Sequence, residues 1–234
     1  MINANPVSTD MDRVLKRFYQ ISIGNITNSD DEKVAKYIHC AKSLFNSWKY
    51  FFNSNYLSNL KNSSHFSNYF CDMLKLYLPE RGNGSWNGME RQEANLCSNP
   101  KLLIEALIDM LNYKTINSLP DYNDVERMLS KYQVQKSTNH VNGMGILLAT
   151  SALFVSNQDN FMVVDKPIMN YFNITTTEDA IQNYQNIIKY SKCLSITYGV
   201  NMWLVNKAYA VSLKGSIKIQ PLCNCNFASQ EINM

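Results

Sequence analysis

The chain has 234 residues, of which 45% are hydrophobic and 18% charged, so it is long enough to bury a sizeable core and too apolar to be disordered throughout. Its formal net charge of +3 is too small to indicate nucleic-acid binding by itself. With 8 Gly and 6 Pro, the composition excludes a fibrous repeat or a linker protein and favours one globular domain over residues 1–234.

Helical periodicity is the main secondary-structure signal along the chain. It first appears after residues 29–32, which include three acidic residues whose carboxylates suit the first turn of a helix. Asn99 and Pro100 are typical of a later helix start, because Asn is a good cap and Pro fits the first helical position. In chain order, the expected helices cover residues 34–52, 65–78, 100–111, 122–132, 145–156, 167–172, 177–198 and 200–213.

Strand signals are brief. The clearest is a short extended segment over residues 161–164, and nothing alternates over several strands, so we expect an all-α (mostly α) fold. Within the single domain, residues 29–120 and 121–213 are candidates for two lobes that share a core. Residues 214–234 are expected to form a loosely ordered tail.

The cysteines and the apolar runs bear on the compartment. Six cysteines are scattered along a chain without a secretion signal, so we expect reduced thiols and a cytoplasmic protein. Only Cys223 and Cys225 are close together, and the three histidines are far from them in sequence, so no metal site is predicted. The longest apolar run, around residues 146–155, is too short to cross a bilayer, so no membrane partner is expected.

The stretch most informative about function runs over residues 139–167. Gly143 and Gly145 form a turn that opens an apolar helix, and glycine allows positive φ or a close approach of the backbone to a ligand. The N–H groups at the start of the following helix then point at an anion. A lone carboxylate, Asp165, follows the extended segment and starts the next helix.

This order of elements resembles the helix-hairpin-helix DNA glycosylase superfamily over about residues 120–213, and residues 198–209 are similar to the closing helix of glycosylase-fold proteins of unassigned role. The resemblance implies a glycosylase-like helical bundle that binds DNA and flips a base into a pocket between lobes. It implies no cofactor beyond a monovalent cation that the hairpin carbonyls of family members can hold. Residues 1–120 carry no motif that indicates a function.

Carried onto this chain, the resemblance makes Asp165 the catalytic carboxylate, which stabilises positive charge on the sugar or orients a water onto C1′. Family members with lyase activity carry a lysine at the position of Leu147, so monofunctional N-glycosidic hydrolysis is expected in place of a Schiff-base mechanism. The family hairpin has Leu-Pro before its first glycine, whereas this chain has Val141-Asn142. The expected nucleic-acid contacts are Asn142, Gly143, Gly145, Ile146 and Lys166.

Other interpretations of the same residues stay open. Asp165 is a preferred helix cap, and the two glycines also suit a tight turn that binds no DNA. Trp86 and Tyr171 are candidate aromatic faces of a base pocket, whereas the spacing of Trp203 favours a core position and His140 is favoured as a turn residue. The alternative function is a non-catalytic DNA-binding or protein-interaction module, such as a component of a toxin or phage-defence system.

Overall fold

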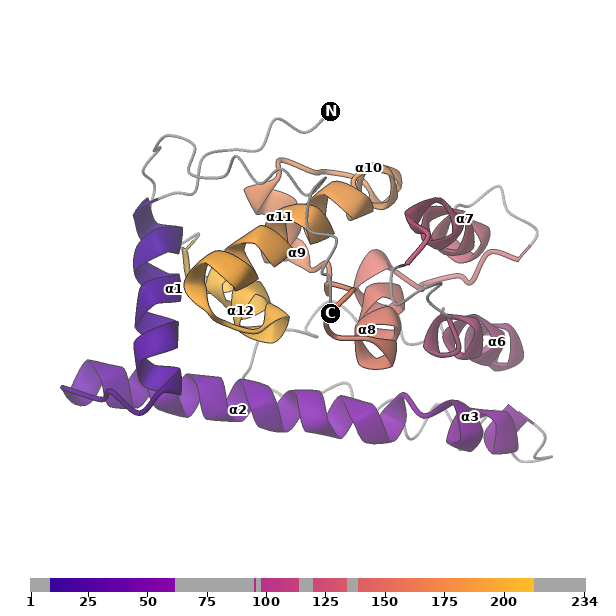
Figure 1. Cartoon of the computed structure of the whole chain (residues 1–234). Coiled ribbons are helices and arrows are strands. Elements are labelled where there is room, and N and C mark those ends of the chain that lie inside the picture. The colour runs from indigo at the N-terminus through magenta and orange to yellow at the C-terminus, as the bar shows by residue number, and fades with distance from the viewer. Residues whose placement is uncertain (1–8, 62–94, 96–97, 114–119, 134–138, 213–234) are drawn as a thin grey trace, which may run out of the picture.

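The computed structural model describes residues 9–61, 95, 98–113, 120–133 and 139–212, and the fold is described within these ranges (Figure 1). They contain helices and no strands, which confirms the all-α fold class. The helices are α1 (Thr9–Ser22), α2 (Ser29–Phe51), α3 (Ser54–Lys61), α6 (Pro100–Leu111), α7 (Tyr122–Gln133), α8 (Ile146–Ser156), α9 (Lys166–Tyr171), α10 (Thr177–Gln182), α11 (Tyr184–Tyr198) and α12 (Met202–Ser212).

Several helices start where local chemistry predicts. The Asn99 side chain accepts the Leu102 N–H at the start of α6, as expected for a cap followed by proline. The helix expected over residues 34–52 begins earlier, at Ser29, because the Asn28 side chain accepts the N–H groups of Asp30 and Asp31. The structure also contains α1 and α3, which the sequence analysis does not predict. The helix predicted over 65–78 lies outside the described residues.

The single helix expected over residues 177–198 is wrong, because the chain breaks at Asn183. The backbone N–H of Asn183 closes α10 on the Asp179 carbonyl, and its side-chain amide donates to the same oxygen at 2.8 Å. Its own carbonyl then accepts the Ile187 N–H and begins α11. Asn competes for local backbone groups in this way, which ends one helix and starts the next within one residue.

The expectation of reduced thiols is wrong for Cys193, which is disulfide-bonded. No other cysteine is near Cys193 in sequence, so its pairing depends on tertiary contacts that spacing does not show. Among the described residues, no helix combines the length and the apolar content that crossing a bilayer needs.

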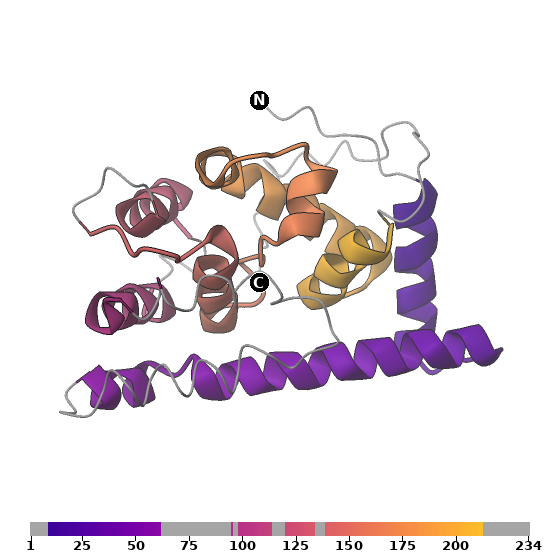
Figure 2. The same ribbon diagram turned by 180° about the vertical axis from the view of Figure 1, so that it is seen from behind.

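Helices from both ends of the described chain pack together. In Figures 1 and 2, α2 and α3 follow one another along one side of the molecule, and α1 stands at the opposite end of α2 beside α12. The Tyr198 hydroxyl donates to Asp12 at 2.8 Å and so links α11 to α1 across 186 positions of sequence. One continuous hydrophobic core includes residues from Met11 in α1 to Tyr209 in α12.

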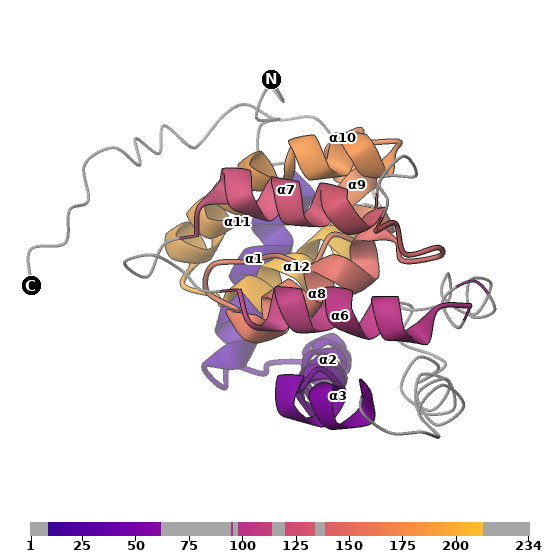
Figure 3. The same ribbon diagram turned by 90° about the vertical axis from the view of Figure 1, so that its right-hand side faces the viewer.

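The helices that carry the candidate site lie inside this arrangement. α8 packs against α6 and α7, and Figure 3 shows α6 and α7 running side by side next to it. α12 contacts α1, α9 and α11, and residues 202–209 are all buried, so this helix is enclosed by its neighbours. Apolar burial of this extent is the main source of stability for a helical domain.

Candidate active site and nucleic-acid interface

The hairpin, residues 141–146, is built as a tight turn between α7 and α8. The Val141 N–H donates to the Tyr132 carbonyl at 2.8 Å, and the Met144 N–H donates to the Val141 carbonyl at 3.1 Å. The side chains of Val141 and Met144 are buried, which fixes the turn to the core. Gly143 has a φ of 80°, a conformation that favours glycine.

The tip of the hairpin is open to solvent. Asn142 is exposed, and a β-carbon placed on Gly145 would meet no atom within 4 Å. Among the described residues, no acceptor pairs with the backbone N–H groups of Gly143, Ile146 and Leu147. The Gly145 N–H instead donates to the Gly143 carbonyl at 3.0 Å, so within the described ranges the unpaired donors of the turn are those of Gly143, Ile146 and Leu147.

The buried segment, residues 161–164, connects the hairpin helix to Asp165 without belonging to a sheet. Its backbone groups must therefore find partners elsewhere, because an unpaired buried amide costs free energy. The Tyr184 hydroxyl accepts the Met162 N–H at 3.4 Å and donates to the Met162 carbonyl at 2.9 Å. The Asn206 side chain donates to the Val163 carbonyl at 2.9 Å. Side chains of α11 and α12 thus hold this extended backbone.

Thr150 links the segment that precedes Asp165 to the first turn of α8. Its hydroxyl donates to the Ile146 carbonyl at 2.7 Å and accepts the Val164 N–H at 2.9 Å. Ile146 is the first residue of the hairpin helix, and Val164 immediately precedes Asp165. One fully buried hydroxyl therefore joins the predicted phosphate-binding turn to the segment that carries the predicted carboxylate.

We expect Thr150→Val to destabilise the protein by about 1–3 kcal/mol, because it leaves the buried Val164 N–H without an acceptor at nearly unchanged side-chain volume. Thr150→Ser keeps the hydroxyl and loses one methyl group, so its main cost is the cavity left by that methyl. Urea unfolding of the two variants measures the difference. Equal stability of the valine variant and the wild type would show that this bridge does not hold the segment.

Asp165 is the N-cap of α9. Its carboxylate accepts the Ile168 N–H at 3.2 Å, and the residue is only 8% exposed. Burial raises the pKa of this carboxyl, whereas the positive charge of Lys207 and the backbone N–H groups of Ile168 and Asp165 oppose the rise. The contact with Ile168 agrees with the helix-cap interpretation, and burial places the same carboxylate in an environment of low dielectric constant.

Lys207 is the site residue that the sequence analysis missed. It lies on α12, is 5% exposed, and its Nζ is 4.1 Å from the centre of the Trp203 ring. Burial lowers the pKa of Lys207 to about 8, although the charge of Asp165 acts in the opposite direction. The available signal was a single lysine inside the apolar stretch of residues 202–210, since lysine is rarely buried without a partner.

Tyr37, on α2, is the third titratable group near this carboxyl. Burial and the negative charge of Asp165 raise the pKa of Tyr37 to about 12, so the phenol is neutral at physiological pH. Lys166 begins α9 and is exposed, in contrast to its neighbour Asp165.

The predicted aromatic residues have different environments. Tyr171 is half-buried, its ring packs edge-on against Tyr209 at 4.8 Å, and its hydroxyl lies 2.9 Å from that of Tyr190. Trp203 is buried and packs against Phe154 at 5.8 Å, which confirms its core position. A base-binding role of Tyr171 stays a prediction, and Trp86 lies outside the described residues.

His140, next to the hairpin, is half-buried, and its Nδ1 is buried with no hydrogen-bond partner in the described part of the chain. The Gln133 side chain at the end of α7 is likewise buried, and neither its oxygen nor its nitrogen is paired with a residue that the structure describes. Both residues flank the connection between α7 and the hairpin. Both side chains have polar atoms with no partner among the described residues, and both residues are close in sequence to the proposed phosphate contact.

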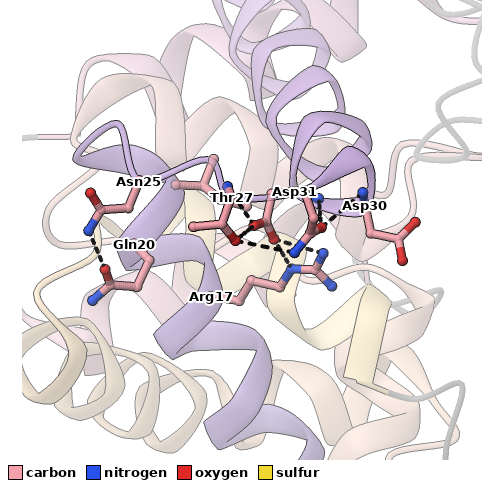
Figure 4. A pocket seen from close by; sticks show the side chains of 8 residues that line it. Arg17, Gln20, Asn25, Thr27, Asp30 and Asp31 are labelled. Atoms are coloured by element: carbon pink, nitrogen blue, oxygen red, sulfur yellow. Dashed lines mark hydrogen bonds and ion pairs between the residues drawn. The ribbon is translucent and has the colours of Figure 1, made fainter.

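A separate surface pocket of about 550 Å³ lies at the corner between α1 and α2 (Figure 4). Arg17 forms an ion pair with Asp31 at 2.9 Å, and the Thr27 hydroxyl donates to the same carboxylate at 2.7 Å. These contacts satisfy the polar groups of the corner and lower the pKa of Asp31, chiefly through the hydrogen bonds from Thr27. None of the predicted site residues lines this pocket, so we assign it a structural role.

Comparison of the chain with protein-family models, with curated proteins and with solved structures gave no match. Any functional assignment therefore rests on the geometry of the hairpin, the buried segment and Asp165. Within the described ranges, no three His, Cys, Asp or Glu side chains gather in a way that could hold a metal ion.

Proposed function

We propose that the protein binds DNA through the hairpin and hydrolyses the N-glycosidic bond of a flipped nucleotide, with Asp165 as the catalytic carboxylate. The observation that supports this most is the Thr150 hydroxyl, which joins the first residue of the hairpin helix to the residue before Asp165. A phosphate-binding turn and a carboxylate are the two parts that base excision requires, and here they belong to one hydrogen-bonded unit.

The hairpin suits a phosphate for three physical reasons. The N–H groups of Gly143, Ile146 and Leu147 lack acceptors among the described residues, and the last two begin an 11-residue helix whose N-terminal dipole favours an anion. Gly145 has no side chain to hold the phosphate away. The exposed Lys166 adds a positive charge close in sequence to the proposed reaction centre.

Asp165 would act on the sugar of the flipped nucleotide. As the bond between C1′ and the base breaks, its electron pair leaves with the base and positive charge develops on C1′ and O4′. The carboxylate stabilises this charge, or takes a proton from the water that attacks C1′. Low solvent exposure strengthens either interaction, because the surrounding dielectric constant is low.

A non-catalytic DNA-binding module is the second candidate. The cap contact with the Ile168 N–H and the 8% exposure of Asp165 favour it, because a carboxylate occupied in this way has a structural role without any reaction. Both candidates require DNA binding, and only the first requires release of a base.

Gly145→Ala tests the hairpin as the DNA contact. The new methyl group meets no protein atom and the residue has a φ of −75°, so the melting temperature should change little. The methyl group would obstruct a phosphate, and we expect affinity for duplex DNA to fall about tenfold, or about 1.4 kcal/mol. Fluorescence anisotropy of a labelled duplex measures the affinity over a series of salt concentrations.

Two lysine variants serve as a matched control for this measurement. Lys166→Ala should weaken binding and flatten its salt dependence, whereas Lys33→Ala, which removes an exposed lysine on α2, should change neither. A wild-type protein that does not bind the duplex would contradict both candidates. If Gly145→Ala binds the duplex as tightly as the wild type, DNA contacts a surface other than the hairpin.

A further inference from the structure

The charges of the chain are unevenly distributed, and the segment that includes most of α2 carries the positive excess. Residues 33–71 contain five lysines and no aspartate or glutamate, so the rest of the chain has more acidic than basic residues. Lys61 is paired with Glu105 on α6 at 2.8 Å. Lys33 is paired with Asp30 in the first turn of α2, also at 2.8 Å.

The other lysines of α2 lie on its solvent-exposed side. Val34, Tyr37 and Ile38 pack against the core, and this fixes which side of the helix faces inward. The exposed polar residues that follow are each three or four positions from the next, which makes them neighbours on the helix surface. This strip, the basic face of α2, comprises Lys36, His39, Lys42, Asn46 and Lys49. It extends about 20 Å along the helix axis, at about 1.5 Å per residue.

The first two lysines of the basic face have no counter-charge within the described ranges. Lys36 and Lys42 are exposed and form no ion pair there, although Glu32 lies one turn before Lys36. A helix face that is only solvated usually carries both signs, since opposite charges three or four residues apart stabilise the helix. The basic face is therefore suited to a negative ligand from outside the chain.

We propose that the basic face of α2 binds the phosphate backbone of duplex DNA as a second contact, separate from the hairpin. In Figures 1 and 3, α6 lies between α3 and α7, and α7 leads into the hairpin, so the two surfaces are on different parts of the molecule. Lysine ammonium groups act as point charges, and contacts to phosphate read no base. The contact is thus independent of DNA sequence, and it goes beyond the proposed function because it requires neither the hairpin nor Asp165.

Two other partners of a basic helix fit this face less well. A helix that lies on an anionic membrane inserts large apolar side chains, and a protein interface centres on apolar or aromatic ones. Among the side chains of α2 that the structure describes, no large hydrophobic one is exposed. A row of point charges needs only the regular negative charge that a phosphate backbone provides.

The test variant is Lys36→Gln with Lys42→Gln, which removes two charges and keeps residues of similar helix propensity. Fluorescence anisotropy of a labelled duplex should show weaker binding, and the slope of log affinity against log salt should become shallower by about two, one for each lost phosphate contact. Duplexes of unrelated sequence should lose the same factor in affinity. Melting temperatures should stay near that of the wild type, because both positions are exposed.

Two further variants control for net charge and for the ammonium groups themselves. Lys33→Gln with Lys189→Gln removes the same charge from exposed positions outside the basic face and should leave the slope unchanged. Lys36→Arg with Lys42→Arg keeps both charges and should bind like the wild type. An unchanged slope in the test variant, or an equal loss of affinity in the net-charge control, would overturn the proposal. Binding to phosphatidylserine vesicles but not to the duplex would overturn it as well.

The hairpin and the reaction are judged by separate outcomes. Gly145→Ala and the test variant alter different surfaces, so their effects on the binding free energy should add. A loss of affinity in Gly145→Ala alone would overturn the second contact and support the hairpin, whereas a loss in the test variant alone would do the reverse. Absence of base release from every protein would overturn the proposed reaction only, since the salt dependence still decides whether α2 contacts DNA.

Discussion

Replacing Asp165 with asparagine is expected to reduce base release at least about a hundredfold, because the amide cannot stabilise the charge on the sugar or accept a proton from water. The measurement uses a panel of labelled duplexes, each carrying one deaminated, oxidised or alkylated base. Alkali then cleaves the strand wherever the protein has left an abasic site. Binding to the same duplexes should persist, since the hairpin is unchanged in this variant.

The fold of Asp165→Asn should survive with a change in unfolding free energy of no more than about 1–2 kcal/mol. Asparagine caps helices as well as aspartate does, so the contact with the Ile168 N–H can be kept. Lys207 can also release its proton once the carboxylate is gone, because burial already lowers its pKa to about 8. The stability loss is therefore small beside the expected loss of activity.

Asp165→Ala separates the two roles of the residue. It removes the cap as well as the charge, which should cost about 1 kcal/mol more than the asparagine variant, while base release falls to the same level in both. If Asp165→Asn still releases the base, Asp165 is not the catalytic carboxylate and serves only as the cap of α9. The same conclusion would follow if activity fell only in proportion to the fraction of unfolded protein.

Much of the fold follows from local sequence chemistry. α6 begins where Asn99 and Pro100 predict, and α8 begins directly after the two glycines of the hairpin. α1 carried an equally clear signal, since acidic residues in its first turn precede apolar residues at helical spacing that the structure buries: Met11, Val14, Leu15, Phe18 and Ile21.

Other features depend on tertiary contacts that a local pattern does not contain. In the sequence, Asn183 resembles any other polar residue on the exposed face of a helix. What marks it as a helix break is the hydrogen bond from its side chain to the Asp179 carbonyl, which the sequence does not show. The candidate site shows the same limit. Asp165 could be found from its position after the hairpin. The burial of Lys207 could not, because it depends on how α12 packs against its neighbours, α9 among them.

The free energy of unfolding should rise with pH above about pH 8 because Lys207 is buried. Its pKa is about 8 in the folded protein and near 10.5 when unfolded. Between these values the unfolded chain holds a proton that the native protein has lost, so the free energy of unfolding rises with pH. The expected gain is about 1 kcal/mol per pH unit from pH 8 to 10, or about 2 kcal/mol over this interval.

Buried tyrosines act in the opposite direction at higher pH. Burial raises the pKa of Tyr37 and of Tyr122 to about 12, and that of Tyr184 still further. An unfolded tyrosine loses its proton near pH 10, so above this value the native state holds more protons and stability falls. The wild type should therefore be most stable between about pH 9 and 10.

Comparison with Lys207→Met isolates the lysine, because the tyrosines contribute to both proteins. Urea unfolding at intervals from pH 7 to 10 should show the rise in the wild type and no rise in the variant. Parallel curves would mean that Lys207 keeps an ordinary pKa and is not a desolvated cation.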